Sequence, residues 1–163
     1  METARPTFRP ATERLFTRPG FLLRRLHQIS VGMFEEACKS LSLTPTQYGT
    51  MVIVNALTDQ DQSSVARQLG LDKVTVMRVL KGLEERGLLV RKVNASDRRQ
   101  YFVSLTAEGK AVLDEANGLA EAVYEKLLSP VPEQERERLI DLLQSWAQDL
   151  EPFARVAMER HRK

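Results

Sequence analysis

The 163-residue sequence has few of the side chains that carry redox and metal chemistry. It contains one cysteine, Cys38, and two histidines, His27 and His161, which lie far apart in the chain. A lone cysteine excludes a disulfide bond within the chain, and this predicts a reducing compartment, the cytoplasm. Zinc sites need a cluster of cysteine and histidine ligands. We therefore expect no metal and no other cofactor.

Long apolar runs and catalytic motifs are also missing from the sequence. No apolar run approaches the ~20 residues that a membrane-spanning helix needs. Residues 1–19 carry scattered arginines and lack the continuous apolar stretch of a secretory signal. We find no phosphate-binding loop, dinucleotide fingerprint or nucleophile elbow. The sequence therefore predicts a cytoplasmic protein that is not an enzyme and has no membrane partner.

Charge is distributed unevenly along the chain, although the formal net charge is only +2. Residues 72–110 hold nine Lys and Arg against five acidic residues, whereas residues 111–154 hold ten acidic residues against three basic ones. Six more arginines lie in residues 1–25. A basic middle beside an acidic stretch suggests one face for a polyanion and another face for a different partner.

The spacing of apolar side chains predicts long helices toward both ends of the chain. We expect helices over residues 21–41, 45–57, 106–128 and 133–150. Thr44 and Pro45 suit the start of the second helix, and Thr106 can cap the third. Residues 1–19 contain three prolines and little periodicity, so we expect an irregular arm there. The terminal helices carry more apolar surface than one small domain needs, which predicts a two-fold homodimer.

The middle of the chain has the outline of a helix-turn-helix. Short helical patterns over residues 63–69 and 72–86 are joined through Gly70. Asp72 is a good N-cap for the second helix, and Gly87 supplies the left-handed residue that ends it. We expect the second helix to be the one that enters a DNA groove.

A β-hairpin is predicted directly after this helix-turn-helix. The apolar period changes to two over residues 88–92 and again over residues 101–105, with a polar turn between them. The fold class is then mainly α (α+β), a winged helix-turn-helix lobe with a two-stranded wing, plus terminal helices that form a dimerisation domain. The expected parts are an arm (1–19) and a single domain (20–163), divided into dimerisation helices (20–44 and 106–163) and the winged helix-turn-helix (45–105).

The segment from Asp72 to Thr106 resembles the multiple-antibiotic-resistance regulator (MarR) family. The matching pieces are Thr75-Val76 and Arg78, Leu83-Glu84-Glu85-Arg86-Gly87-Leu88, the wing signature Asp97-Arg98-Arg99, Leu105-Thr106 with Glu108-Gly109, and the helix start Leu43-Thr44-Pro45-Thr46-Gln47-Tyr48. The resemblance extends over roughly residues 20–150, and the combination is far more specific than any one piece. It implies a homodimeric regulator that binds a pseudo-palindromic operator in double-stranded DNA.

The candidate DNA-binding residues follow from the helix periodicity and from the resemblance. Val76, Val79, Leu80 and Leu83 point inward, so the opposite side of that helix is free to face a major groove. The predicted contacts are Ser64, Lys73, Val74, Thr75, Met77, Arg78 and Lys81, with Asp97, Arg98 and Arg99 in the wing. The resemblance implies that Arg99 enters a minor groove, that Asp97 steadies it and that Arg98 contacts the DNA backbone.

Three positions depart from the family pattern. Val74 and Met77 stand where serine-like residues are common, and Gly82 lies inside the recognition helix. One interpretation is that Val74 touches thymine methyl groups. The alternative is that one or both of Val74 and Met77 pack against a neighbouring element. Gly82 costs ~1 kcal/mol of helix stability relative to alanine, and it permits either close packing or bending.

The resemblance also implies a small effector that releases a repressor from DNA. Family regulators commonly bind aromatic anions between the dimer helices and the DNA-binding lobe, here between residues 21–41, 45–57 and 106–120. The segment from Arg18 to Leu26 resembles members that govern aromatic-acid catabolism, which predicts an aromatic acid or its coenzyme A thioester as effector. The candidate effector residues are Arg24, Arg25, His27, Gln28 and Tyr48. Alternatively, Arg24 and Arg25 are surface charges or pair with acids of the other subunit.

Two other functions are compatible with parts of the sequence. Cys38 permits a peroxide-sensing regulator, because some family members sense peroxide through a cysteine that tyrosines hydrogen-bond. A winged helix can also serve as a protein-interaction module. The arginine pair at the wing tip argues against that module, since an adaptor has no need of it.

Overall fold

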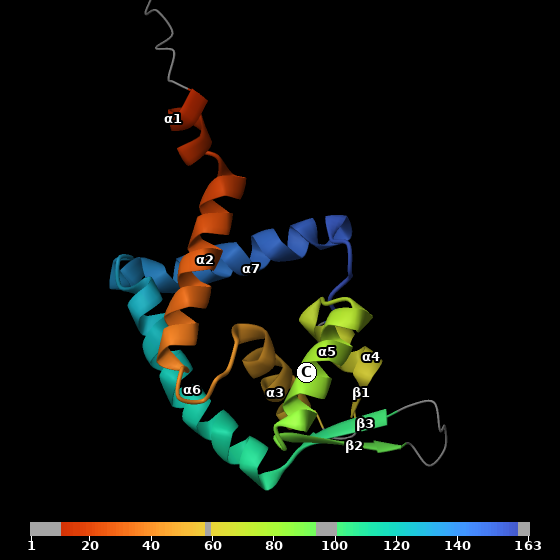
Figure 1. Cartoon of the computed structure of the whole chain (residues 1–163). Helices are drawn as coiled ribbons and strands as arrows, with labels where there is room; N and C mark the ends of the chain where they lie inside the picture. The colour runs from red at the N-terminus through yellow and green to blue at the C-terminus, as the bar shows by residue number, and fades with distance from the viewer. Residues whose placement is uncertain (1–10, 58–59, 94–100, 160–163) are drawn as a thin grey trace, which may run out of the picture.

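The computed structural model describes residues 11–57, 60–93 and 101–159. In chain order these form α1 (Ala11–Phe16), α2 (Pro19–Ala37), α3 (Pro45–Ala56), β1 (Gln60–Asp61), α4 (Gln62–Leu69), α5 (Lys73–Glu85), β2 (Leu89–Val93), β3 (Tyr101–Leu105), α6 (Ala107–Leu128), α7 (Glu133–Leu150) and a 3-10 turn (Glu151–Phe153). Figure 1 shows α3, α4, α5 and the sheet gathered in one lobe, with α6 running from the sheet to the start of α7. No helix in the described ranges is both long and apolar enough to cross a membrane.

Side-chain caps set the boundaries of the helix-turn-helix. The carboxylate of Asp61 accepts a hydrogen bond from the Ser64 backbone N–H at 2.8 Å, and α4 ends at Gly70 with φ of 61°. Asp72 caps α5 in the same way, accepting from the Thr75 N–H at 2.9 Å. These bonds satisfy donors that a helix leaves free at its start. The predicted helix-turn-helix is confirmed.

The sheet has three strands in the order β1-β3-β2, all antiparallel to their neighbours. Leu89 pairs with Leu105 and Val93 pairs with Tyr101, so β2 and β3 form the predicted wing hairpin. β1 adds a short third strand that pairs Gln60 with Val103. We did not expect β1, because two residues are too few to show a period of two.

One apolar core joins the lobe to α2 and α6. Its buried members are Phe34, Cys38, Leu43, Met51, Val54, Val65, Ala66, Val76, Leu80, Leu83, Leu88, Leu89, Val103, Leu105, Leu113, Ala116, Ala120 and Val123. The buried face of α5 therefore packs in the same core as the inner side of α6. The lobe and the long helix are parts of one folded unit.

The N-terminal expectation was wrong in part. Residues 11–16 form α1 and α2 begins at Pro19, where we expected an irregular arm. Proline suits the first position of a helix because its fixed φ is helical and it has no N–H to leave unpaired. α1 is held by an edge-to-face contact between Phe16 and Phe21, with ring centroids 5.3 Å apart. Fewer than two turns of helix carry no readable period, so this helix could not be recognised from the spacing of its apolar residues.

The helix expected over residues 21–41 ends earlier, at Ala37. The turn that follows places Ser42 at φ of 49°, an unusual conformation for a residue with a side chain. The Arg86 guanidinium donates to the carbonyl oxygens of Leu41 and Ser42 at 2.7 and 2.9 Å and stabilises this turn. A residue 44 positions away from Ser42 thus stabilises the turn that follows α2.

The junction between β2 and α6 is unusually close. A Cβ atom placed on Gly109 would lie 2.0 Å from the Leu88 carbonyl oxygen. The Thr106 hydroxyl accepts from the Gly109 N–H at 2.9 Å and donates to the Gly87 carbonyl oxygen at 2.8 Å. The first turn of α6 is therefore held against Gly87 and Leu88, the two residues that lead into β2.

Candidate nucleic-acid interface and ligand pocket

α5 has one buried and one exposed face, as its periodicity predicted. Val76, Leu80 and Leu83 are buried, and Val79 is half-buried. Lys73, Val74, Met77, Arg78 and Lys81 are all exposed, and Thr75 is half-buried. Gly82 lies in open space, since nothing would contact a Cβ placed there. It makes no close helix contact in the described structure.

Asp72 orders the first turn of this helix. The Thr75 hydroxyl donates to its carboxylate at 2.6 Å. This bond, followed by the bond from the Thr75 N–H, holds the pKa of Asp72 below its ordinary value. The carboxylate therefore stays charged and accepts both bonds. As a result the Thr75 hydroxyl proton is directed at Asp72, and its oxygen keeps only acceptor capacity for another partner.

The cations on the exposed face of α5 differ in their partners. Lys81 lies 3.6 Å from the Glu85 carboxylate, one helical turn later. Lys73 and Arg78 have no ion-pair partner among the residues that the structure describes. These two cations are therefore available to an external anion or base edge.

The wing is anchored to α5 through an ion pair. The Arg91 guanidinium of β2 donates to the Glu84 carboxylate, through Nε at 2.7 Å and also through Nη2. The bond from Arg91 lowers the pKa of Glu84, so the pair stays charged. It fixes the first strand of the wing against the recognition helix. Asp97, Arg98 and Arg99 lie outside the described residues.

Ser64 lies in the first turn of α4 beside an interaction that sequence reasoning missed. Its hydroxyl accepts from Arg67 at 3.0 Å, and the Arg67 Nε donates to the Glu159 carboxylate at 2.8 Å. The Glu159 N–H also donates to the Arg67 carbonyl oxygen at 3.0 Å. The segment after α7 thus returns to the helix-turn-helix, 92 residues away in sequence, and no local pattern indicates such an interaction.

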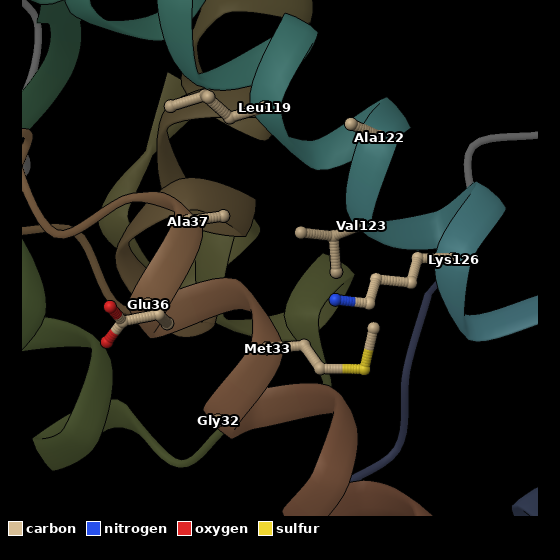
Figure 2. Close-up of a pocket in the computed structure, with 8 residues that line it drawn as sticks. All are labelled: Gly32, Met33, Glu36, Ala37, Leu119, Ala122, Val123 and Lys126. Carbon is tan, nitrogen blue, oxygen red and sulfur yellow. The ribbon is translucent and has the colours of Figure 1, made fainter.

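A cavity of about 510 Å³ lies between α2 and α6. Its lining residues, shown in Figure 2, are Gly32, Met33, Glu36, Ala37, Leu119, Ala122, Val123 and Lys126. Apolar side chains make most of the wall. The Lys126 side chain extends from α6 toward Met33, whereas the Glu36 carboxylate points away from it. Lys126 has no ion-pair partner in the described parts of the chain.

The five candidate effector residues do not line this cavity. Arg24, Arg25, His27 and Gln28 are exposed on the first half of α2. The Arg24 guanidinium lies 5.0 Å from the centre of the Phe21 ring. Arg25 precedes Gly32 by about two turns, so it lies on the face of α2 that leads to the cavity. The Tyr48 hydroxyl donates a hydrogen bond to Asn117 Oδ1 at 2.9 Å. Tyr48 belongs to α3, and no residue of α3 lines the cavity.

Cys38 is buried at the end of α2. Burial, and then the charge of Glu115, raises the pKa of its thiol. The raised pKa favours the protonated thiol, which reacts more slowly with oxidants than a thiolate does. Tyr48 and Tyr124 lie near enough to Cys38 for its charge to raise the pKa of each phenol. The Tyr48 hydroxyl donates to Asn117, and the described residues show no hydrogen bond from either phenol to the thiol. Burial and the raised thiol pKa therefore argue against the peroxide-sensing alternative.

The fold and the exposed face of α5 define a winged helix-turn-helix protein of the kind that binds DNA. Comparison with known proteins agrees. The MarR family model matches residues 43–101. A probable transcriptional regulator from Pseudomonas aeruginosa has 31% identity, with 82% of this chain and 99% of that chain covered and a TM-score of 0.78. The chain belongs to the MarR family of DNA-binding transcriptional regulators.

Two further proteins show what similar chains bind. The transcriptional repressor CouR, bound to a 23-mer DNA duplex, has 27% identity, 85% and 99% coverage and a TM-score of 0.79. CouR from Rhodococcus jostii RHA1 bound to p-coumaroyl-CoA has 30% identity, 82% and 94% coverage and a TM-score of 0.70. PcaV from Streptomyces coelicolor, in complex with its natural ligand, has 28% identity, 82% and 94% coverage and a TM-score of 0.74.

Proposed function

We propose that this protein is a homodimeric repressor that binds a pseudo-palindromic operator and leaves it when an aromatic anion binds. The observation that carries the DNA-binding part is the exposed face of α5. On that face Lys73 and Arg78 form no ion pair with any described residue, while the opposite face is buried. A two-fold dimer presents two such helices ~34–36 Å apart, to successive major grooves. The likeness to CouR on duplex DNA supports this arrangement.

We assign a chemical role to each polar or charged residue of the proposed DNA-binding surface. Arg78 suits the O6 and N7 atoms of guanine, and Lys73 and Lys81 suit phosphates. Ser64, at the start of α4, is assigned to the DNA backbone. In the wing, Arg99 is assigned to the minor groove, Arg98 to phosphate and Asp97 to the support of Arg99. Thr75 offers an acceptor to a base edge because its proton is held by Asp72.

Exposed apolar surface supports the homodimer. α7 has no buried residue in the single chain, although it carries an apolar stripe. Exposed members of α2 and α7 are Leu22, Leu23, Leu26, Ile29, Ile140, Leu142, Leu143, Trp146 and Leu150. Contiguous apolar surface of this kind usually marks an interface. We therefore assign residues 20–44 and 106–163 to dimerisation, and residues 45–105 to the DNA-binding lobe.

The effector is assigned to the cavity between α2 and α6. Its size and apolar wall suit an aromatic ring, and Lys126 suits the ring's anionic substituent. Arg25 is placed on the same face of α2 to meet a longer anionic group, such as that of a coenzyme A thioester. CouR bound to p-coumaroyl-CoA is the relative that supports this class of ligand. The effector releases DNA by preferring a different spacing of the two lobes.

The DNA-binding assignment predicts different results for two arginines. Arg78→Ala should weaken operator binding about 5- to 150-fold and relax the sequence preference, because a bidentate base contact is worth ~1–3 kcal/mol. Arg99→Ala should weaken binding and lower the slope of log affinity against log salt by about 1 for each phosphate that it no longer neutralises. Salt titrations by fluorescence anisotropy measure both. Lys39→Ala removes an exposed cation outside the assigned surface and serves as the control. If both arginine variants bind the operator with the wild-type affinity, the DNA-binding face is assigned wrongly.

The effector assignment predicts loss of response without loss of DNA binding. Lys126→Met keeps the apolar stem and removes the charge, so release of operator by p-coumarate or p-coumaroyl-CoA should need about 10- to 100-fold more ligand. Arg25→Ala should impair the response to the thioester more than the response to the free acid. Arg24→Ala is the comparison, since Arg24 lies on the Phe21 ring. Weaker dimerisation with an unchanged ligand response would instead indicate inter-subunit ion pairs.

A further inference from the structure

The exposed face of α5 carries two neighbouring apolar side chains. Val74 is 66% exposed and Met77 is 44% exposed. Residues three apart are adjacent on a helix surface, so the two form one patch beside Arg78. Neither side chain is buried against a neighbouring element, which was the alternative left open by the sequence. An apolar patch in the centre of a face that meets DNA requires an apolar partner there.

Few hydrogen-bonding groups on this face are free to read bases. The Thr75 hydroxyl proton is held by Asp72 at 2.6 Å, and Lys81 lies 3.6 Å from Glu85. Two long side chains next to the patch, Lys73 and Arg78, have no ion-pair partner in the described chain. Lys73, at the start of the helix, is assigned to phosphate, which leaves Arg78 to contact a base. A polar base edge buried against Val74 or Met77 would lose its bonds to water without replacement, which is costly. The patch therefore disfavours most base edges.

One major-groove group matches the patch. The C5-methyl group of thymine is the apolar feature of the major-groove base edges, and the other features are donors and acceptors. Val74 and Met77 are separated by ~4.5 Å along the helix axis, and neighbouring base pairs are separated by ~3.4 Å. The two side chains are thus spaced to face neighbouring base pairs. Arg78 follows Val74 by four residues, on the same face.

We propose that Val74 and Met77 read thymine methyl groups on neighbouring base pairs of each half-site, beside a guanine that Arg78 contacts. This inference rests on the proposed use of α5 as the recognition helix. The operator would then need thymine methyl groups beside a G·C pair. The serine-like residues that are common at these two positions in the family would not impose that requirement.

Deoxyuridine tests the proposal directly, because it is thymidine without the methyl group. Duplexes are first enriched from a random pool with the wild-type protein. Each thymine of the enriched duplex is then replaced singly by deoxyuridine, and affinity is measured by fluorescence anisotropy. At one or two positions per half-site the replacement should lower affinity about fourfold, and about fifteenfold when both half-sites are changed, as expected when one methyl group per half-site is no longer buried.

Variants then assign each methyl group to a side chain. Val74→Ala should bind the thymine and deoxyuridine duplexes equally at one position, and Met77→Ala should do so at the neighbouring position. Val52→Ala, a change at an exposed valine of α3, should keep the full discrimination. Failure to enrich any duplex over a scrambled one would refute the proposed DNA-binding function itself. Specific binding with no sensitivity to deoxyuridine, or sensitivity that persists in both variants, would overturn the thymine assignment and leave that function standing.

Discussion

Replacing Gly109 with alanine is expected to lower the melting temperature by about 6–12 °C. The added methyl group would lie 2.0 Å from the Leu88 carbonyl oxygen. The backbone fixes the positions of both groups, so no side-chain rotation relieves the clash. Overpacking of this kind costs ~3 kcal/mol, and each kcal/mol shifts the melting temperature of a chain of this size by ~2–4 °C. Differential scanning calorimetry at fixed protein concentration measures the shift. Operator binding should weaken as well, because the wing starts at the displaced strand.

Gly118 provides a matched control in the same helix. Nothing lies within 4 Å of a Cβ placed there, so the substitution to alanine adds helix propensity without a clash. Gly118→Ala is expected to leave the melting temperature unchanged or to raise it, because the substitution increases the free energy of unfolding by up to ~1 kcal/mol. Equal melting temperatures for the two variants would show that the close approach at Gly109 does not exist in solution.

The double substitution of Leu142 and Trp146 with glutamate is expected to dissociate the dimer. Leu142 is 60% exposed and Trp146 is 39% exposed in the single chain, and residues four apart share a face of α7. Burying such a side chain stabilises an interface by ~1.5–3 kcal/mol, and the two-fold axis doubles the effect. The dimer dissociation constant should therefore rise by at least about 10³. Sedimentation equilibrium measures it, and circular dichroism reports whether the chain stays folded.

The polar side of the same helix supplies the control. Gln144→Glu with Gln148→Glu adds the same two charges without removing apolar surface. This pair should leave the dimer almost intact. If the Leu142 and Trp146 variant dimerises like wild type, then α7 does not form the interface and the assignment of residues 106–163 to dimerisation is wrong.

The parts of the fold that depend on local chemistry could be predicted. Thr44, Asp72 and Thr106 each accept the capping hydrogen bond that their positions suggested. Gly87 adopts the left-handed conformation, with φ of 72°, that ends the recognition helix. Such signals lie within a few residues of the structure that they specify, so one sequence is enough to read them.

The parts that depend on distant residues could not be predicted. The turn after α2 is stabilised by Arg86, and α4 is bound through Arg67 to Glu159. The cavity arises where two helices cross with small side chains at Gly32, Ala37 and Ala122, and neither helix alone reveals that void. The effector candidates predicted from the sequence, four on α2 and Tyr48 on α3, were selected for their polar or charged side chains, and a sequence gives no comparable signal for a cavity.

Helix α6 connects the cavity with the residues that lead into the wing. The cavity lies against its far end, and Gly109 lies against the wing at its near end. Gly109 and Val123 are ~21 Å apart along the helix axis, so a tilt of about 5° at the cavity moves the near end by ~2 Å. The close approach at Gly109 would pass such a displacement to Gly87 and Leu88, which directly follow α5 and its C-cap Arg86. Under the proposed function, an aromatic effector that tilts α6 by a few degrees in both subunits would change the distance between the two α5 helices by several ångströms.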